Sequence, residues 1–426
     1  MELKIDLTKP PGRVKLWVTF FSLILCAVFV LNVIAYLLPA YDERSPIGYK
    51  GVTYNKRQRV LQPRYRRDEW NTSGTPIPCN QKKHILFIKV PKCGSSTLSS
   101  IIIRFGFRHG LKTALPLGNK FSLVSLLRSL DKNGHQSDKH DVFASHVRYQ
   151  VIKEHEHLVP NDAFRTAIIR EPLSAFKSFF NYRQKGAAFG LGAKNQLETF
   201  FSNSAFYASP DSARFWNRMI RYLGYNMPDN TTQSTPHAVE EARTYVYHVD
   251  REFDFVVVLE YFDECLILLK RMLCWETHDM FYTQHKTGST YSKDYDTAIK
   301  KVSDPLVDRR FRELNYADYI LYDYFKSKVE KTIAKQDSDF FKELRDFRRV
   351  NSRVTQFCQS STSLEESLEI PSSKWSRGFT MRKTYCRLLN FGVNKYDTFL
   401  KNEKFTQYIN VGKNSEPRQP RRDKSS

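Results

Sequence analysis

Residues 85–99 read ILFIKVPKCGSSTLS and contain the passage that decides the fold. The apolar run over residues 85–90 has the length and β-branched content of a buried strand, and it ends in a small-residue turn that carries Lys92. Residues 97–107 follow with the spacing of an amphipathic helix. Such a turn can bind a phosphate, because backbone N–H groups and the positive end of the helix dipole point into it.

The turn differs from the nucleotide-binding P-loop in the order of its residues. In a P-loop the lysine follows the last glycine and precedes a serine or threonine, whereas here Lys92 precedes Gly94. The motif alone therefore leaves open which phosphate-bearing group the turn holds.

From residue 81 onward the chain alternates between strand-like and helix-like segments. Strands are expected over residues 85–90, 141–145, 163–169 and 253–259, and helices over residues 97–107, 172–183, 212–223 and 262–275. This alternation predicts an α/β domain with a mainly parallel central sheet flanked by helices. Ligands of such sheets bind at the carboxyl ends of the strands, which is where the turn with Lys92 lies.

A second strand-to-helix passage has a similar chemical character. Arg170 ends one expected strand, Pro172 suits the first turn of a helix, and Ser178 lies about two turns further on. An arginine offers a planar pair of donors to a phosphate, and a serine hydroxyl adds a third. The alternative is an ion pair at a helix start beside a solvent-facing serine. Two anion sites on adjacent strand ends would fit a nucleotide with phosphates at two separate places.

His146 ends the expected strand 141–145, near the same edge of the sheet. Histidine has a pKa suited to accepting a proton near neutral pH, so His146 is the candidate general base, although most of the eleven histidines must be structural or merely exposed. If His146 is not the base, Asp141 or Glu171 is the next candidate.

The charge balance indicates an acidic partner. The chain of 426 residues has 67 Lys and Arg against 45 Asp and Glu, a formal net charge of +22, and such an excess attracts polyanions. Part of the excess lies in the basic stretch 56–67 and in residues 412–426, which we expect to be a disordered basic tail. No zinc-finger spacing and no long basic helix is present, so nucleic-acid binding is not expected.

Residues 16–38 carry no charged side chain and are long enough to cross a bilayer. The apolar core exceeds that of a cleavable signal peptide, so we expect an uncleaved transmembrane signal anchor. Basic residues in positions 1–15 then place this tail in the cytosol and the rest of the chain in the lumen. Residues 39–80, polar and proline-containing, are expected to be a luminal stem.

Two further features fit a luminal chain. Asn71 and Asn230 each begin a glycosylation sequon. Besides Cys26 in the anchor, six cysteines are available for disulfides, whose pairing the sequence leaves open. No CxxC spacing occurs, so a metal site is not expected.

Several blocks of sequence together resemble one family. They are KVPKCGSSTL (89–98), LSSIIIRFGFRHGL (98–111), HVRY (146–149), IIREPLSAFKSFF (168–180) and VLEYFDECLILLKRMLCWE (258–276). These blocks resemble the galactose 3-O-sulfotransferases, Golgi enzymes that use 3′-phosphoadenosine 5′-phosphosulfate (PAPS) as donor, and with a weaker match near Tyr385 the resemblance covers roughly residues 82–400. One departure is Lys92-Cys93-Gly94, where members of the family have Lys-Thr-Ala or a similar triplet. The run Pro-Lys-Cys-Gly-Ser is more similar to the uronyl 2-O-sulfotransferases.

The resemblance implies a P-loop-like sulfotransferase fold over residues 81–411 and metal-free, in-line transfer of a sulfuryl group. It implies that Lys92 faces the bridging oxygen of the donor, that Arg170 and Ser178 hold the 3′-phosphate, and that His146 deprotonates the acceptor. The donor-binding residues that it implies are Lys89, Pro91, Lys92, Cys93, Gly94, Ser95, Ser96, Thr97, Arg170 and Ser178.

The resemblance implies an acceptor with a terminal galactose, on a galactosylceramide-like glycolipid or on a glycan, and a single-pass type II protein of the Golgi membrane. The alternatives are a uronyl 2-O-type glycosaminoglycan sulfotransferase, a type II Golgi glycosyltransferase and a membrane-anchored lectin. A glycosyltransferase often has a DxD metal motif at a strand end, but the two DxD triplets, 294–296 and 337–339, follow no apolar strand and are interpreted as solvated surface. The oligomeric state cannot be read from the sequence.

Overall fold

Five parallel strands form the central sheet, in the order β2-β3-β1-β4-β5. The computed structural model describes residues 79–114, 139–192, 194–227, 234–283, 305–360, 366–389, 391 and 396, all within the compact unit 65–426. The strands are β1 (Ile85–Ile88), β2 (Thr113–Ala114), β3 (Val142–Ser145), β4 (Phe164–Ile169) and β5 (Phe255–Val258). The predicted α/β class with a mainly parallel sheet is therefore confirmed.

The register aligns the carboxyl ends of the central strands. Ile88 of β1 is level with Ser145 of β3 and with Ala167 of β4, and Ile169 is level with Val258 of β5. The segments that follow these strands therefore meet along one edge of the sheet. Every residue of β1, β3 and β5 is buried, as expected of strands covered on both faces.

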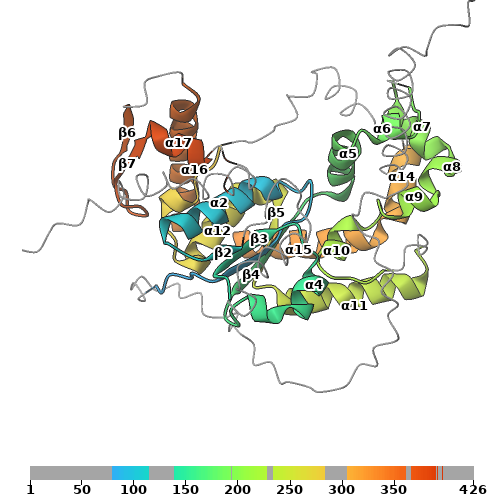
Figure 1. Ribbon diagram of the computed structural model, residues 1–426, viewed down its shortest axis with the longest axis horizontal. Helices are drawn as coiled ribbons and strands as arrows, with labels where there is room; N and C mark the ends of the chain where they lie inside the picture. The colour runs from blue at the N-terminus through green and yellow to red at the C-terminus, as the bar shows by residue number, and fades with distance from the viewer. Residues whose placement is uncertain are drawn as a thin grey trace, which may run out of the picture. The chain divides into compact units, whose positions relative to one another are not determined.

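Helices cover both faces of the sheet. Figure 1 shows α2 (Ser95–Arg108) and α12 (Phe262–Leu273) on one side, and α4 (Tyr149–Glu154) and α11 (Pro236–Glu252) on the other. Two long helices, α15 (Tyr316–Ala334) and α16 (Ser338–Gln359), follow later in the chain. Short 3-10 turns lie at η1 (Glu156–Leu158), η2 (Leu259–Tyr261) and η3 (Thr277–Asp279). The predicted helices 97–107, 172–183 and 262–275 correspond to α2, α5 (Pro172–Tyr182) and α12.

The single helix predicted over residues 212–223 is wrong. The chain forms two short helices there, α9 (Pro210–Ala213) and α10 (Arg218–Tyr222), with Asn217 between them in the left-handed conformation at φ 52°. A non-glycine residue adopts this conformation at a cost, so another part of the structure must compensate for it.

The compensation comes from a reciprocal cap between α10 and α15. The Asn217 Oδ1 atom accepts hydrogen bonds from the N–H groups of Ala317 (3.0 Å) and Asp318 (3.2 Å) in the first turn of α15. The Asp318 carboxylate accepts from Met219 N–H (3.1 Å) and Ile220 N–H (2.9 Å) in the first turn of α10. Each helix thus satisfies N–H groups that the other leaves without an acceptor. We call this arrangement the cross-cap.

A second hydrophobic core lies beside the sheet domain. It is rich in aromatic side chains and includes Phe176 and Phe180 of α5, Phe200, Trp216 and Phe311. Residues of this core come from α5, α7 (Gln196–Ser202), α14 (Pro305–Leu314) and α15, and α8 (Ser204–Tyr207) packs against it. In Figure 1, α5, α6 (Lys185–Ala188), α7, α8, α9 and α14 are grouped to one side of the sheet. Because α5 begins just after β4, this core is joined directly to the edge where the strand ends meet.

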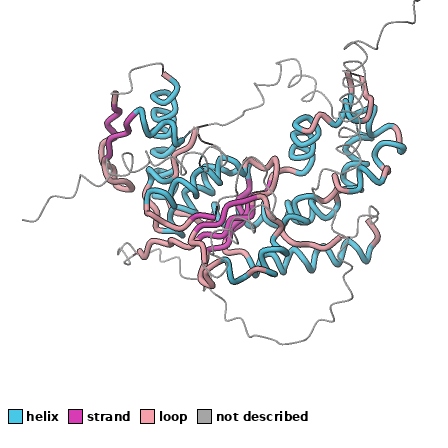
Figure 2. The backbone as a smooth tube through the Cα atoms, in the orientation of Figure 1, coloured by secondary structure: helices cyan, strands magenta, loops and turns pink. Residues whose placement is uncertain are grey.

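Two disulfides settle the pairing that the sequence left open. Cys79 pairs with Cys274, and Cys358 of α16 pairs with Cys386 of α17 (Lys383–Leu389). The second bond lies beside a hairpin of β6 (Ser367–Ile370) and β7 (Phe379–Arg382), which is separate from the main sheet in Figure 2. Cys93 and Cys265 are buried free thiols.

Several predictions fall outside the described residues. They concern the tail 1–15, the anchor 16–38 with Cys26, most of the stem 39–80, both sequon asparagines (Asn71 and Asn230), and residues 412–426. Within the part of the chain that the structure describes, no helix combines the length and apolarity needed to cross a membrane.

Candidate functional site

The turn after β1 depends on two residues with left-handed backbone. Lys92 has φ 66° and Gly94 has φ 74°. A Cβ atom on Gly94 would lie 2.5 Å from Leu259 Cδ1, so both the backbone angle and the space favour glycine at this position. The Cys93 thiol packs inside the turn, where its sulfur lies 3.6 Å from the Pro91 carbonyl oxygen. We call residues 89–97 the donor loop, after the donor-binding role that the sequence resemblance implies for them.

Helix α2 begins in the donor loop with an open N-terminus. Its N-cap is Gly94, which has no side chain to accept from the first N–H groups, and the first turn contains no acidic residue. Thr97 N–H donates to the Gly94 carbonyl (3.1 Å). The N–H groups of Ser95 and Ser96 come earlier in the first turn, where the helix itself offers them no carbonyl acceptor. Ser95 is buried and Ser96 is exposed. The first turn can therefore bind an anion.

The thiol of Cys93 is buried and is not a candidate nucleophile. Burial is the main cause that raises the pKa of this thiol, with the Asp318 carboxylate adding to the effect. The thiol therefore stays protonated and is a poor nucleophile.

His146 lies against the same loop. Its Nδ1 atom is 2.7 Å from the backbone oxygen of Lys89. A carbonyl oxygen only accepts, so Nδ1 carries the hydrogen and Nε2 holds the lone pair in the neutral ring. Burial, followed by the charge of Lys89, lowers the pKa of His146 to about 3. The ring is therefore neutral at physiological pH, which is the form that can accept a proton.

Arg170 joins the second predicted anion site to the first. Its Nη1 atom donates to the Lys92 carbonyl over 3.4 Å. This contact links the end of β4 to the turn after β1, as the aligned strand ends lead one to expect. The structure thus brings together Lys92, His146 and Arg170 from the ends of three adjacent strands.

Ser178 shares a face of helix α5 with Tyr182, whose ring contacts Lys92 of the donor loop. Glu171 caps the helix by accepting from the N–H groups of Leu173 (3.0 Å) and Ser174 (2.6 Å). Ser178 and Tyr182 are four residues apart and share a face, and the Nζ atom of Lys92 lies 4.1 Å from the centre of the Tyr182 ring. The phenylalanines of α5 are buried in the second core.

Two arginines of the site were not predicted from the sequence. The charges of Arg218 and Arg183 both contribute to the low pKa of His146. Arg218, the first residue of α10, also packs its guanidinium 4.1 Å from the Phe179 ring. No motif identifies Arg218, because its position depends on the cross-cap. Tyr182 could have been found by extending the helical face of Ser178 by one turn.

The two alternative bases have other roles. Asp141 precedes β3, so it lies at the amino end of the strand that His146 follows, where it accepts from Lys112 N–H (2.8 Å) and pairs with His84 (3.4 Å). The structure therefore contradicts Asp141 as a reserve base. Glu171 is near the donor loop, but its carboxylate caps α5 and also accepts from Tyr319 (3.2 Å).

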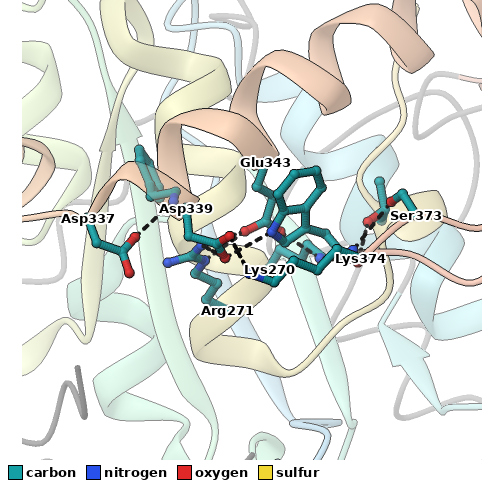
Figure 3. A network of polar contacts seen from close by, with 10 residues as sticks. Lys270, Arg271, Asp337, Asp339, Glu343, Ser373 and Lys374 are labelled. Carbon is teal, nitrogen blue, oxygen red and sulfur yellow. Dashed lines mark hydrogen bonds and ion pairs between the residues drawn. The ribbon is translucent and has the colours of Figure 1, made fainter. Parts of the chain in front are cut away.

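The DxD triplet at 337–339 serves the start of α16. Asp337 accepts from Phe340 N–H (2.9 Å), and Asp339 accepts from Lys374 (2.6 Å) and Trp375 Nε1 (2.9 Å). Figure 3 shows these contacts beside the ion pair of Lys270 with Glu343. The triplet lies on a helix rather than at a strand end, as its sequence context predicts; the other triplet, 294–296, lies outside the described residues. Among the residues that the structure describes, no group of three or more potential ligands could hold a metal ion.

Comparison with known proteins finds one matching family model and several similar sulfotransferases. The family model described as galactose-3-O-sulfotransferase matches residues 16–376. A galactosylceramide sulfotransferase of Bos taurus is 30% identical over 349 residues, which cover 79% of this chain and 78% of the relative. The Homo sapiens galactosylceramide sulfotransferase is 30% identical over 294 residues (67% and 66%), and galactose-3-O-sulfotransferase 3 of Mus musculus is 28% identical over 278 residues (64% and 63%).

Proposed function

This chain belongs to the galactose-3-O-sulfotransferase family and is a sulfotransferase, and we propose that it transfers a sulfuryl group from PAPS to the 3-hydroxyl of a galactose residue. The acceptor that we propose is a galactose-terminated glycolipid of the galactosylceramide type or a glycan. The relatives named above support a galactose acceptor, and galactosylceramide is the acceptor named for two of them.

One observation carries the proposal. The ends of β1, β3 and β4 meet, so that the Arg170 side chain binds the backbone of Lys92 (3.4 Å) and His146 binds the backbone of Lys89 (2.7 Å). A donor with phosphates at two places needs two anion sites, and an acceptor hydroxyl needs a base close to the group that is transferred. The meeting of these strand ends supports a site in which Arg170, the donor loop and His146 would provide all three groups.

The residues of the donor loop fit a phosphosulfate. The N–H groups of Ser95 and Ser96 at the open start of α2 would hold its oxygens, with the hydroxyls of these serines and of Thr97 as further donors. Arg170 and Ser178 would hold the 3′-phosphate. PAPS supplies the activated sulfuryl group; everything else in the reaction is positioning and proton transfer by the chain.

Lys92 would act on the leaving group, and His146 would act on the acceptor hydroxyl. Lys92 would place its ammonium where negative charge develops as the sulfur–oxygen bond breaks, an interaction that strengthens in the transition state. His146 would accept the hydroxyl proton at Nε2, because Nδ1 is committed to the Lys89 carbonyl. The negative charge of the bound donor would stabilise the imidazolium until solvent removes the proton.

The uronyl 2-O-sulfotransferase alternative rests on the Lys92-Cys93-Gly94 triplet. In the structure Cys93 is buried and Gly94 is confined by Leu259, so the triplet serves the shape of the loop and says little about the acceptor. We therefore keep galactose as the acceptor.

We also propose that the protein is a single-pass type II protein of the Golgi membrane with its catalytic domain in the lumen. The apolar segment 16–38 supports an anchor, and two disulfides support an oxidising compartment. The protein should then stay with membranes after a carbonate wash, and protease outside intact vesicles should leave residues beyond 41 uncut. Release into the wash would contradict the anchor.

The function is tested by incubating the purified chain with ³⁵S-labelled PAPS and a panel of β-galactosides, with galactosylceramide and a uronic-acid-containing oligosaccharide included. Label on the galactose 3-hydroxyl is the expected result. In parallel, 3′,5′-ADP should raise the melting temperature, and ATP with Mg²⁺ should not. Label on the uronic acid alone, or stabilisation by ATP with Mg²⁺ alone, would refute the proposal.

A further inference from the structure

Tyr182 is an aromatic side chain that serves no core. Three large hydrophobic side chains of the described residues are exposed, namely Tyr182, Tyr247 and Phe341, and Tyr182 is 49% exposed. It is the last residue of α5, whose phenylalanines are buried in the second core. Because so much of its ring faces solvent, packing alone does not explain a tyrosine at this position.

What the Tyr182 ring does contact is the ammonium of Lys92. The Nζ atom lies 4.1 Å from the ring centre, well inside the range in which a cation is attracted to an aromatic face. A lysine side chain has four flexible carbon–carbon bonds, so its ammonium samples many positions unless a contact restricts it. The ring restricts it to the side of the donor loop on which α5 lies.

The backbone of Lys92 is also held from the segment that joins β4 to α5. The Lys92 carbonyl accepts from Arg170 at the end of β4 (3.4 Å), and the Lys92 backbone has the unfavourable φ of 66°. Arg170 and Tyr182 bracket a single element, α5, whose first turn is fixed by the Glu171 carboxylate. Backbone and side chain of Lys92 are therefore both held by β4 and α5.

We propose that Tyr182 is a positioning residue that sets the place of the Lys92 ammonium for sulfuryl transfer. This inference rests on the proposed function, in which Lys92 stabilises the leaving group. It adds a link between the two anion sites, because Ser178 lies one turn before Tyr182 on the same face of α5. A 3′-phosphate bound by Arg170 and Ser178 thus holds the element that orients the lysine for the other phosphate.

The test compares Tyr182→Phe with Tyr182→Leu. The matched control is Tyr247→Leu, at an exposed tyrosine of α11 whose ring packs edge-to-face against Tyr324. Tyr182→Leu should lower kcat roughly 2- to 30-fold, the range of one cation–aromatic contact, with 3′,5′-ADP affinity within about twofold of the unmodified chain. Tyr182→Phe keeps the ring and should keep kcat.

A second readout needs no donor. Amine labelling followed by mass spectrometry gives the reactivity of the Lys92 ammonium, and an aromatic face stabilises its protonated, unreactive form. Lys92 should be labelled faster in Tyr182→Leu at a fixed pH and unchanged in Tyr182→Phe and Tyr247→Leu.

The outcomes separate this inference from the proposed function. If the unmodified chain transfers label from PAPS but Tyr182→Leu has normal kcat and normal Lys92 labelling, the positioning role is wrong and the function stands. A Tyr182→Phe variant as slow as Tyr182→Leu would also overturn it, since the hydroxyl would then be the active group. If the unmodified chain neither transfers label nor binds 3′,5′-ADP, the function itself fails, whatever the labelling shows.

Discussion

The replacement of His146 by asparagine separates its proton-accepting role from its hydrogen bond. An asparagine amide can still donate to the Lys89 carbonyl, but it cannot take up a proton. We expect His146→Asn and His146→Ala to lose about 10²–10⁴-fold in kcat, the usual contribution of a general base. The affinity for 3′,5′-ADP should stay within about threefold, since the ring does not contact the phosphate sites in the proposed mechanism. His157→Asn, at an exposed histidine of η1, is the control.

The pH dependence of kcat/KM tests how far the pKa of His146 is lowered. With the ordinary pKa of about 6.5, only about a quarter of a histidine population is neutral at pH 6. Burial and the charge of Lys89 lower the pKa of His146 to about 3, so the ring remains neutral to well below pH 5. We therefore expect kcat/KM, which reports the free enzyme, to lose nothing to His146 protonation between pH 7 and pH 5. The acid limb of kcat should lie at higher pH, because a bound polyanionic donor favours the imidazolium.

The assay is initial-rate transfer of ³⁵S from PAPS at pH 4.5–8, with the ionic strength held constant. A kcat/KM profile that falls with an apparent pKa near 6.5, and that becomes flat in His146→Asn, would refute the view that burial keeps this ring neutral. Retention of more than about a tenth of kcat in His146→Ala would remove it as the base.

Four other substitutions test other parts of the structure. Lys92→Ala should abolish turnover while calorimetry still detects 3′,5′-ADP binding, whereas Arg170→Ala should weaken that binding by roughly 2–5 kcal/mol; the reverse pattern would exchange their roles. Asn217→Ala should lower the free energy of unfolding in urea by about 1–3 kcal/mol, because two buried N–H groups of α15 lose their acceptor, and an unchanged urea midpoint would contradict the cross-cap. Burial lowers the pKa of His278 to about 3, so the unfolded chain binds the extra proton and stability should fall below pH 6.5 by up to about 1.4 kcal/mol per pH unit; His278→Gln should reduce that slope.

The strands of the sheet were predictable because a parallel strand covered on both faces is a short apolar run. Four of the five strands have this pattern. The fifth, β2, has two residues, Thr113 and Ala114, and two residues carry no periodicity. The helix break at Asn217 was not predictable for another reason: its cause is a partner about a hundred positions away, and no local pattern near residue 217 records the start of α15.

Some residues of the site were predictable from the sequence and others were not. Lys92, His146 and Arg170 could be named from the sequence because each follows an apolar run, and strand ends converge in a parallel sheet. The part played by Arg218 and the contact of Tyr182 with Lys92 depend on how α5 and α10 pack. The sequence predicted that six cysteines could pair, but the choice of pairs depends on distances that only the folded chain defines.

The pairing of Cys79 with Cys274 has a consequence for biosynthesis. The two cysteines are separated by 195 positions, so in the luminal orientation that we propose Cys79 would enter the oxidising compartment long before its partner. The thiol of Cys93 in the donor loop arrives much sooner, and a bond between these two would abolish the loop. Exchange requires a thiolate, and burial of Cys93 suppresses its thiolate. If the chain follows the secretory route that we propose, burial of Cys93 should protect the donor loop from exchange with Cys79 until Cys274 becomes available.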